Sequence, residues 1–199
     1  MIGHWDDGPL GPMADVMWAR PGGRRVLLAD RSETATFVSA VYAFDEVHVV
    51  PFRAARDERG IDLTAGPLEI SLRCGAGWRL PPLAVRPSWA TRFLEAPVAR
   101  LAMGVHAYGT SPTGVREWYR ALVWRPVVAG SGRLDGVPLG GLAPLAPPLG
   151  VGFSEPPRRP SMVLVRPQLE DPTGRLDEIL SGLAPATAAG RPGPTVRSP

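Results

Sequence analysis

Two kinds of side chain alternate along residues 115–124, which read VREWYRALVW. In an extended strand, successive side chains point to opposite faces. Glu117 and Tyr119 therefore share a mostly apolar face with Val115. The opposite face interleaves arginine with tryptophan, in the order Arg116, Trp118, Arg120 and Trp124. This stretch predicts a strand with one face turned to the core, and the candidate site is built on it.

Strand and helix patterns lie on both sides of this segment. Residues 31–43 repeat apolar side chains at helical spacing, and a second helix is expected to begin at Ser88. Residues 46–73 alternate with period two and are predicted to form a meander rather than strand-helix-strand units. Pro126 is expected to interrupt the run of strand residues, and Asp135-Gly136 is a strong signal for a two-residue hairpin turn.

These patterns favour the α+β fold class. We expect a curved, mainly antiparallel β-sheet or partial barrel of roughly seven to nine strands, with two helices and a disordered C-terminal tail. Two Gly-Pro pairs near the start oppose regular structure, so residues 1–13 are predicted to be an irregular N-terminal arm. A single α+β domain is expected over residues 14–170. A short helix within residues 171–183 and a disordered tail over residues 184–199 complete the prediction.

All 22 basic residues are arginine, and the chain contains no lysine. Without a lysine amine, the chain cannot form a Schiff base with a carbonyl substrate or with pyridoxal phosphate. The lysine of a P-loop or of a protein kinase is missing as well. Cys74 is the single cysteine, which excludes an intrachain disulfide and a multi-cysteine metal site. Whole classes of reaction are thus ruled out, but no reaction is identified.

The charge and hydropathy patterns also limit the partners. A net charge of +3 gives little support to a nucleic-acid partner. No apolar run approaches the roughly 20 residues that span a bilayer, and the first residues do not form a secretory signal. We therefore expect a cytoplasmic protein with no nucleic-acid partner and no membrane partner. The sequence leaves the oligomeric state open.

Glu117 is the first candidate for chemistry. A carboxylate on an apolar face has a raised pKa when it is buried, and this suits general acid/base catalysis. His106 lies in the strand that is expected to pair with this segment and could act as the base, with Tyr119 as a proton donor. The alternatives are structural. Glu117 would then pair with an arginine at the rim of the sheet, and His106 would be a hydrogen-bonded strand residue.

Arg116, Arg120 and Trp118 are the candidates for ligand binding. A guanidinium group can hold a carboxylate or phosphate through two hydrogen bonds, and an indole ring can stack on a flat ligand. The alternative is an outer face on which arginine lies over tryptophan by cation–π contact. The three histidines show no metal-ligand spacing, so we predict no metal and no cofactor.

Four short segments carry a resemblance. They are Asp15-Val16-Met17, Phe44-Asp45-Glu46-Val47, Gly66-Pro67-Leu68 and Arg116-Glu117-Trp118-Tyr119. In these segments the chain resembles a family of small, uncharacterised proteins from GC-rich bacteria, over most of residues 3–166. The resemblance implies one recurring bacterial domain and brings no activity, ligand or catalytic residue with it.

Three functions remain open at this point. The first is non-covalent binding of a small molecule, anionic or apolar, in a cavity of the β-sheet. The second is a lyase, isomerase or cyclase that needs neither lysine nor metal and uses Glu117 or His106 for acid/base chemistry. The third is a structural or interaction protein without a ligand. A closed cavity lined by Glu117 and Tyr119 would favour the first two, and a packed interior would favour the third.

Overall fold

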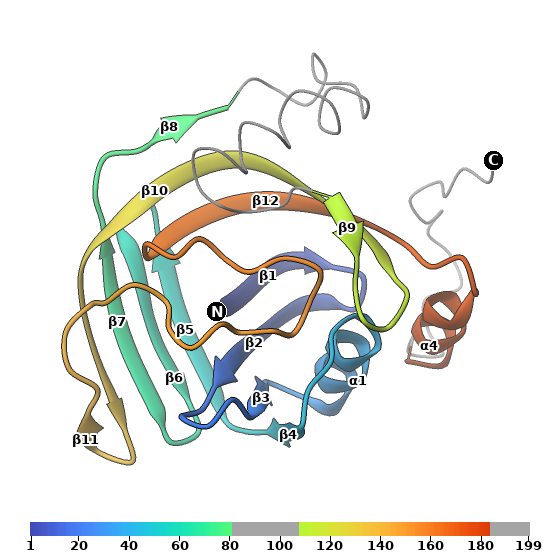
Figure 1. The fold of residues 1–199 in the computed structure, drawn as a ribbon, viewed down its shortest axis with the longest axis horizontal. Coiled ribbons are helices and arrows are strands. Elements are labelled where there is room, and N and C mark those ends of the chain that lie inside the picture. Colours follow the sequence, from blue (N-terminus) through green and yellow to red (C-terminus); the bar gives the residue numbers. More distant parts are fainter. Residues whose placement is uncertain (81–107, 184–199) are drawn as a thin grey trace.

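The computed structural model describes residues 1–80 and 108–183. The helix expected from Ser88, the tail expected over residues 184–199 and the candidate base His106 lie outside these residues. The described residues form two β-sheets and two helices that do not close into a barrel (Figure 1). The predicted α+β fold class is confirmed, with a mixed sheet beside the antiparallel one.

The smaller sheet is mixed, and its strands lie in the order β1-β2-β3-β4. These strands are β1 (Ile2–Gly8), β2 (Gly11–Ala19), β3 (Arg25–Ala29) and β4 (Glu46–Val49). The larger sheet is antiparallel, with the order β11-β10-β7-β6-β5 and with β8, β9 and β12 also paired to β10. Its strands are β5 (Phe52–Asp57), β6 (Gly60–Ala65), β7 (Leu68–Cys74), β8 (Trp78–Arg79), β9 (Tyr108–Thr110), β10 (Arg116–Leu134), β11 (Val137–Pro138) and β12 (Ser161–Glu170). The described helices are α1 (Ser32–Val41) and α4 (Arg175–Leu183).

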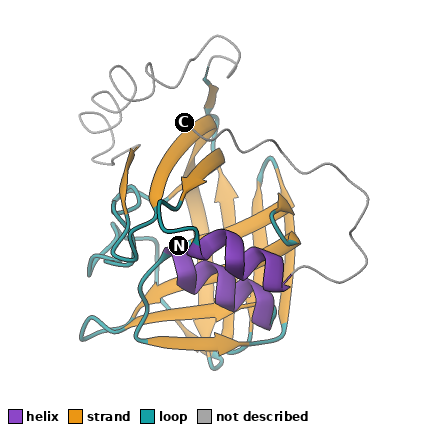
Figure 2. Cartoon of the chain, turned by 90° about the vertical axis from the view of Figure 1, so that its right-hand side faces the viewer, coloured by secondary structure: helices purple, strands orange, loops and turns teal. Residues whose placement is uncertain are grey.

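The small sheet is covered on both faces. One face packs on α1 and α4 through a core that includes Leu27, Phe37 and Leu176. Figure 2 shows these two helices side by side, in front of the strands. The other face packs on β6 and β7, where Val26 meets Leu63 in a second core, and Figure 1 shows the large sheet curling around it. Because both faces are covered, β2 is buried at every position from its third to its seventh residue.

A parallel pair of strands departs from the predicted meander. β3 and β4 are parallel, and α1 connects them. The helix buries Phe37, Val38 and Val41 in the first core, and the chain therefore returns to lie beside β3. The expectation of a meander without strand-helix-strand units is wrong for this pair. It is correct for β5, β6 and β7, which follow one another in antiparallel order.

The predicted irregular arm over residues 1–13 is wrong. β1 pairs antiparallel with β2 in a register that places Gly3 opposite Asp15 and Trp5 opposite Met13. The two Gly-Pro pairs fall at the end of β1 and the start of β2, so they mark the turn between two strands. The apolar side chain of Trp5 packs against the first core, which gives this hairpin a buried face.

β10 is one continuous strand of 19 residues. The sequence predicted two strands with an interruption at Pro126, and that prediction is wrong. The first half of β10 pairs with β12 and the second half pairs with β7. Pro126 lies where one neighbour takes over from the other, and its carbonyl accepts a hydrogen bond from the Gly75 N–H at 2.8 Å. A proline is tolerated there because a strand residue at the end of a ladder does not have to donate.

Two predicted features of the chain are confirmed. Asp135 and Gly136 form a two-residue turn between β10 and β11, with φ of 51° and 77°. Positive φ at both positions is the geometry of a type I′ hairpin. The short helix predicted within residues 171–183 is α4.

Gly60 provides a test of how closely β6 and β7 approach. A Cβ atom at this position would lie 1.9 Å from the carbonyl oxygen of Leu72. We predict that Gly60→Ala lowers the free energy of unfolding by about 2–4 kcal/mol, because neither strand can move without disturbing its hydrogen bonds. Urea unfolding measures the change. Gly141→Ala is the matched control, since nothing lies within 4 Å of a Cβ atom there. Equal effects of the two substitutions would contradict the close approach.

Candidate functional site

Glu117 belongs to a buried group of polar side chains between α1 and β10. Its side chain is 0% exposed. The Tyr42 hydroxyl donates a hydrogen bond to Glu117 Oε2 at 2.7 Å. The hydroxyls of Tyr42 and Tyr119 are hydrogen-bonded to each other. One carboxyl and two phenols thus form a connected network, which we call the Glu117 cluster.

Local structure brings these three side chains together. Glu117 and Tyr119 are two residues apart on β10 and therefore share a face. Tyr42 caps the C-terminus of α1 with an extended backbone, so its side chain leaves the helix. A Cβ atom on Gly152 would lie 3.0 Å from two carbons of the Tyr42 ring. Phe153 stacks on the Tyr119 ring, with centroids 5.4 Å apart. The loop around these last two residues therefore packs directly against both phenols.

The buried position of the Glu117 cluster changes its acid/base properties. Burial raises the pKa of Glu117, and hydrogen bonds with Tyr42 and Tyr119 oppose this rise. Burial also raises the pKa of both phenols, so they stay protonated at neutral pH. Glu117 Oε1 has no hydrogen-bond partner among the described residues. An oxygen without a donor favours the protonated carboxyl, because an isolated buried charge is unfavourable.

Asp15 is a second buried carboxyl in the same core layer. Its side chain is 1% exposed, and Gly3 lies directly opposite on β1. A Cβ atom on Gly3 would lie 2.3 Å from Asp15 Oδ1, so the glycine leaves room for the carboxyl. Burial raises the pKa of Asp15 to about 6, although the nearby N-terminal amine of Met1 and then a hydrogen bond with Trp5 oppose the rise. The pKa of Tyr119 is raised mainly by burial and by the nearby charge of Glu117. The charge of Asp15 makes a smaller contribution in the same direction. Asp15 therefore lies close enough to the Glu117 cluster for its charge to act on Tyr119.

The other predicted site residues do not join the Glu117 cluster. Arg116 Nη1 lies 3.1 Å from Glu170 Oε1 on β12, and both side chains are about half exposed. Trp118 packs on Tyr108, with ring centroids 4.9 Å apart. Arg120 is half-buried on the same strand. The predicted ligand-binding residues are therefore spread along the other face of β10, and Arg116 and Trp118 already contact protein side chains.

Trp124 does not lie on the face that the alternation predicted. The pairing of β10 with β12 shifts by one residue between Ala121 and Val123. A bulge of one residue reverses the alternation beyond it. Trp124 therefore leaves the face of Arg120, and it stacks on Trp78 with centroids 4.5 Å apart.

Sequence reasoning missed Tyr42, Asp15 and Trp5 as parts of this site. Tyr42 was counted only as an apolar residue of the predicted helix, and Trp5 fell in the predicted arm. Asp15 carried a usable signal, because it is a single acid on a strand face that it shares with Met13 and Met17. The contacts themselves depend on strand register, which the local sequence does not contain.

A broad trough of about 710 Å³ lies on the large sheet. Its lining side chains alternate along the strands with Leu63 and Ile70, which pack in or against the second core. The trough therefore occupies the face that points away from the small sheet. Its polar lining comes from four neighbouring strands, with Arg53 on β5, Asp62 and Thr64 on β6, Glu69 and Ser71 on β7, and Ser131 and Arg133 on β10.

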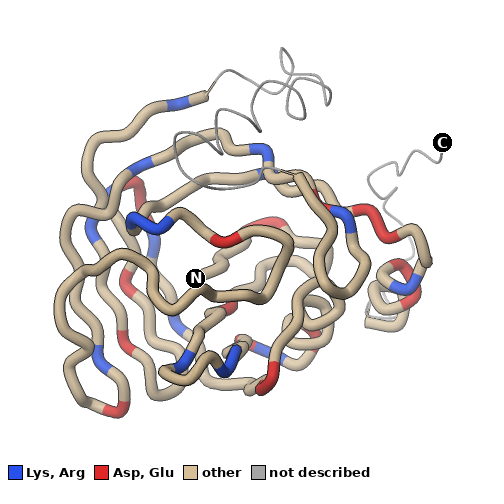
Figure 3. The backbone as a smooth tube through the Cα atoms, in the orientation of Figure 1, with Lys and Arg blue, Asp and Glu red and all other residues tan. Residues whose placement is uncertain are grey.

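Four of the lining residues form one row across the sheet. Arg53 lies opposite Thr64, Thr64 opposite Glu69, and Glu69 opposite Arg133. The side chains of Arg53, Glu69 and Arg133 form no hydrogen bond or ion pair with another residue in the described part of the chain. Figure 3 shows basic and acidic positions interspersed over these strands. The trough thus holds three ionic groups that are free to bind a ligand.

A smaller cleft of about 300 Å³ lies between the two sheets. Its charged groups are engaged: Asp30 Oδ2 accepts the Ala14 N–H at 3.2 Å, and Arg31 donates to two backbone carbonyls. Neither this cleft nor the trough is lined by Glu117 or Tyr119. Glu117 is therefore packed in the interior, whereas Tyr42 and Tyr119 are partly buried.

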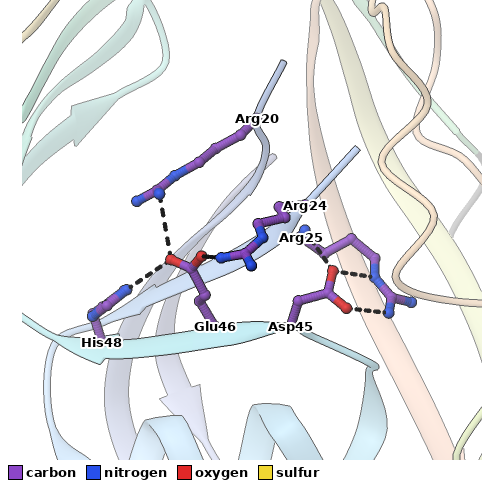
Figure 4. A network of polar contacts seen from close by, with 6 residues as sticks. All are labelled: Arg20, Arg24, Arg25, Asp45, Glu46 and His48. Atoms are coloured by element: carbon purple, nitrogen blue, oxygen red, sulfur yellow. Dashed lines mark hydrogen bonds and ion pairs between the residues drawn. The ribbon is translucent and has the colours of Figure 1, made fainter. Parts of the chain in front are cut away.

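A network of ion pairs ties β3 to β4 at one edge of the small sheet (Figure 4). Arg25 donates from Nε and Nη2 to the two carboxylate oxygens of Asp45, at 2.9 and 2.8 Å. These hydrogen bonds hold the pKa of Asp45 well below its usual range. Glu46 accepts a hydrogen bond from Arg24 at 2.6 Å and lies 3.4 Å from Arg20. The arginines of this network have carboxylate partners, which distinguishes them from those of the trough.

No family model, curated protein or solved structure matches the chain, so its function is inferred from its own residues. The helices in residues 1–80 and 108–183 are too short or too polar to cross a membrane. The same residues contain no group of three or more His, Cys, Asp and Glu side chains that could hold a metal ion.

Asp15 gives the first test of the buried layer. Its pKa is raised on folding, so the protein gains stability below the pKa of the unfolded state and loses it as the pH rises through about 6. Asn is neutral at every pH. We predict that Asp15→Asn stabilises the protein by about 2–3 kcal/mol at pH 7 and changes little at pH 4. Urea unfolding from pH 4 to pH 7 measures this, with the exposed Asp7→Asn as control. Parallel stability curves for wild type and Asp15→Asn would contradict the assignment.

The bond between Tyr42 and Glu117 gives the second test. We predict that Tyr42→Phe lowers the free energy of unfolding by about 1–3 kcal/mol, because it leaves a buried carboxyl without its donor. Glu117→Gln keeps an acceptor and cannot ionise, so it should leave the melting temperature unchanged or raise it at pH 7. The double variant Tyr42→Phe/Glu117→Gln completes a double-mutant cycle, which measures the interaction energy between the two side chains apart from the effect of each single substitution. A coupling energy near zero in this cycle would show that the two side chains act independently.

Proposed function

We propose that the protein binds a small polar molecule non-covalently in the trough. The observation that carries this proposal is a set of three exposed ionic side chains that have no partner among the described residues, Arg53, Glu69 and Arg133. Charged side chains on a sheet usually pair across neighbouring strands. Glu69 and Arg133 lie directly opposite each other, yet they are not paired. Because these side chains form no ion pair with each other, their hydrogen-bonding groups remain available to a ligand.

The size and support of the trough agree with this role. A volume of about 710 Å³ falls within the roughly 300–1,000 Å³ that is typical of small-molecule sites. The side chains stand on four strands that are hydrogen-bonded to one another. Their inward neighbours Leu63 and Ile70 pack in or against the second core. Binding groups carried on packed strands keep a fixed spacing better than groups on loops.

Acid/base catalysis at Glu117 has less support. The network with Tyr42 and Tyr119 can hold and share a proton, which is the property that a general acid needs. Its carboxyl is fully buried, however, and neither cleft reaches it. A substrate would therefore need the packed layer to open. We assign the Glu117 cluster a structural role and place binding in the trough.

Side-chain NMR with small probe ions tests the proposed site. We expect acetate to shift the guanidinium signals of Arg53 and Arg133 in a saturable way, and methylammonium to shift the carboxyl signal of Glu69. Arg59 is the internal control, because it is an exposed arginine outside the trough. In the double variant Arg53→Gln/Arg133→Gln, acetate should have no saturable site on this sheet. Equal, non-saturating shifts at all three arginines would refute the proposal.

A further inference from the structure

We propose that the trough binds a short molecule that carries two anionic groups with one cationic group between them. A blocked acidic-basic-acidic tripeptide has this chemistry. The inference rests on the proposed binding function and goes beyond it, because it specifies the order of charges in the ligand. The order of Arg53, Glu69 and Arg133 across the sheet carries the argument.

The spacing of the three ionic groups follows from the register. β5, β6, β7 and β10 are consecutive neighbours in the sheet. Adjacent strands lie about 4.8 Å apart, so Arg53 and Glu69 are about 10 Å apart at the backbone, and Glu69 and Arg133 are about 5 Å apart. A complementary ligand therefore spans about 14 Å or less between its anionic ends. A tripeptide covers this length with its flexible side chains, provided that its backbone is bent so that all three charged groups face the sheet.

Charge complementarity sets the order of groups in the ligand. Each arginine matches a carboxylate or phosphate through two parallel hydrogen bonds, and Glu69 matches an ammonium or guanidinium group. A simple dianion would meet repulsion from Glu69. A simple cation would meet repulsion from the two arginines. The site carries a net charge of +1 from these three groups, so it favours a ligand with a net charge of −1.

The remaining lining favours an amide backbone over a flat ring. The hydroxyl groups of Thr64 and Ser131 can each donate and accept hydrogen bonds, while Ser71 donates to Asp62 at 2.7 Å and can only accept. Asp62 is already bound to Arg73 at 2.9 Å and does not compete for the cation. No aromatic side chain is present among the described lining residues. The trough therefore offers no stacking surface for a nucleobase.

Isothermal titration calorimetry with blocked tripeptides tests the inference. The probes are acetylated and amidated Glu-Lys-Glu, the reversed Lys-Glu-Lys, and Glu-Gln-Glu, each titrated at low salt. We expect Glu-Lys-Glu to bind about tenfold tighter than either of the others. Arg59→Gln should change none of these affinities, because Arg59 lies outside the trough.

Substitutions at Glu69 and Arg133 identify which protein side chain binds which charged group of the peptide. Glu69→Gln should weaken the binding of Glu-Lys-Glu about three- to tenfold, because the lysine of this peptide loses its carboxylate partner. The same substitution should strengthen the binding of Glu-Gln-Glu, because it removes the repulsion between Glu69 and the acidic side chains of that peptide. Arg133→Gln should weaken both. Circular dichroism and the melting temperature establish that each variant is folded, as expected for exposed positions.

The outcomes separate this inference from the proposed function. Equal affinity for Glu-Lys-Glu and Lys-Glu-Lys would overturn the charge order. The same holds if neither peptide binds while acetate still occupies Arg53 and Arg133, and in that case the proposed site stands. If acetate finds no preferred site on the sheet, both proposals fail together. Tight binding of Glu-Lys-Glu that depends on Glu69 supports both.

Discussion

The backbone ladders of β10 are the constraint on which the rest of the structure depends. Each strand residue has to satisfy its backbone N–H and C=O groups, and β10 does so with β12 along one half and with β7 along the other. This division fixes Glu117 at one end of the strand, facing α1, and Arg133 at the other end, facing away from the small sheet. The positions of the interior polar layer and of the trough thus both follow from the registers in which β10 pairs with its neighbours.

The interior polar layer and the trough differ in the environment of their ionisable side chains. Glu117 and Asp15 lie inside an apolar layer, where burial raises the pKa of each carboxyl and favours its neutral form. Their hydrogen bonds link strands and helix, and they present nothing to the surface. Arg53, Glu69 and Arg133 are exposed, and their side chains have no hydrogen-bond or ion-pair partner in the part of the chain that the structure describes. Burial and exposure therefore separate the interior polar layer from the trough, although both are built from ionisable residues on strands.

Much of the fold could be predicted from local patterns. The alternation along residues 115–124 predicted a strand with Glu117 on its mostly apolar face and left open whether that face is buried. The structure has the strand and buries Glu117. Helical spacing over residues 31–43 and the Asp135-Gly136 turn were also correct. The errors share one cause. The parallel pairing of β3 with β4, the strand β1 and the changed face of Trp124 all depend on which strands pair and in what register, and the partner is the adjacent strand for β1 and a more distant one for the other two. A single bulge was enough to reverse the alternation on which the face of Trp124 was predicted.

The sequence by itself determined the fold class, the absence of lysine chemistry and the face of its strand on which Glu117 lies, because composition and period are properties of the chain alone. Only the tertiary structure decided which groups meet. Tyr42 and Glu117 are separated by 75 residues and share a hydrogen bond. Arg53 and Arg133 come from opposite sides of a four-strand row. Register is a relation between strands, and a shift by one residue would exchange the two faces of each strand. For that reason the trough has no signature in the sequence, and the free charges within it became visible only when the strands were paired.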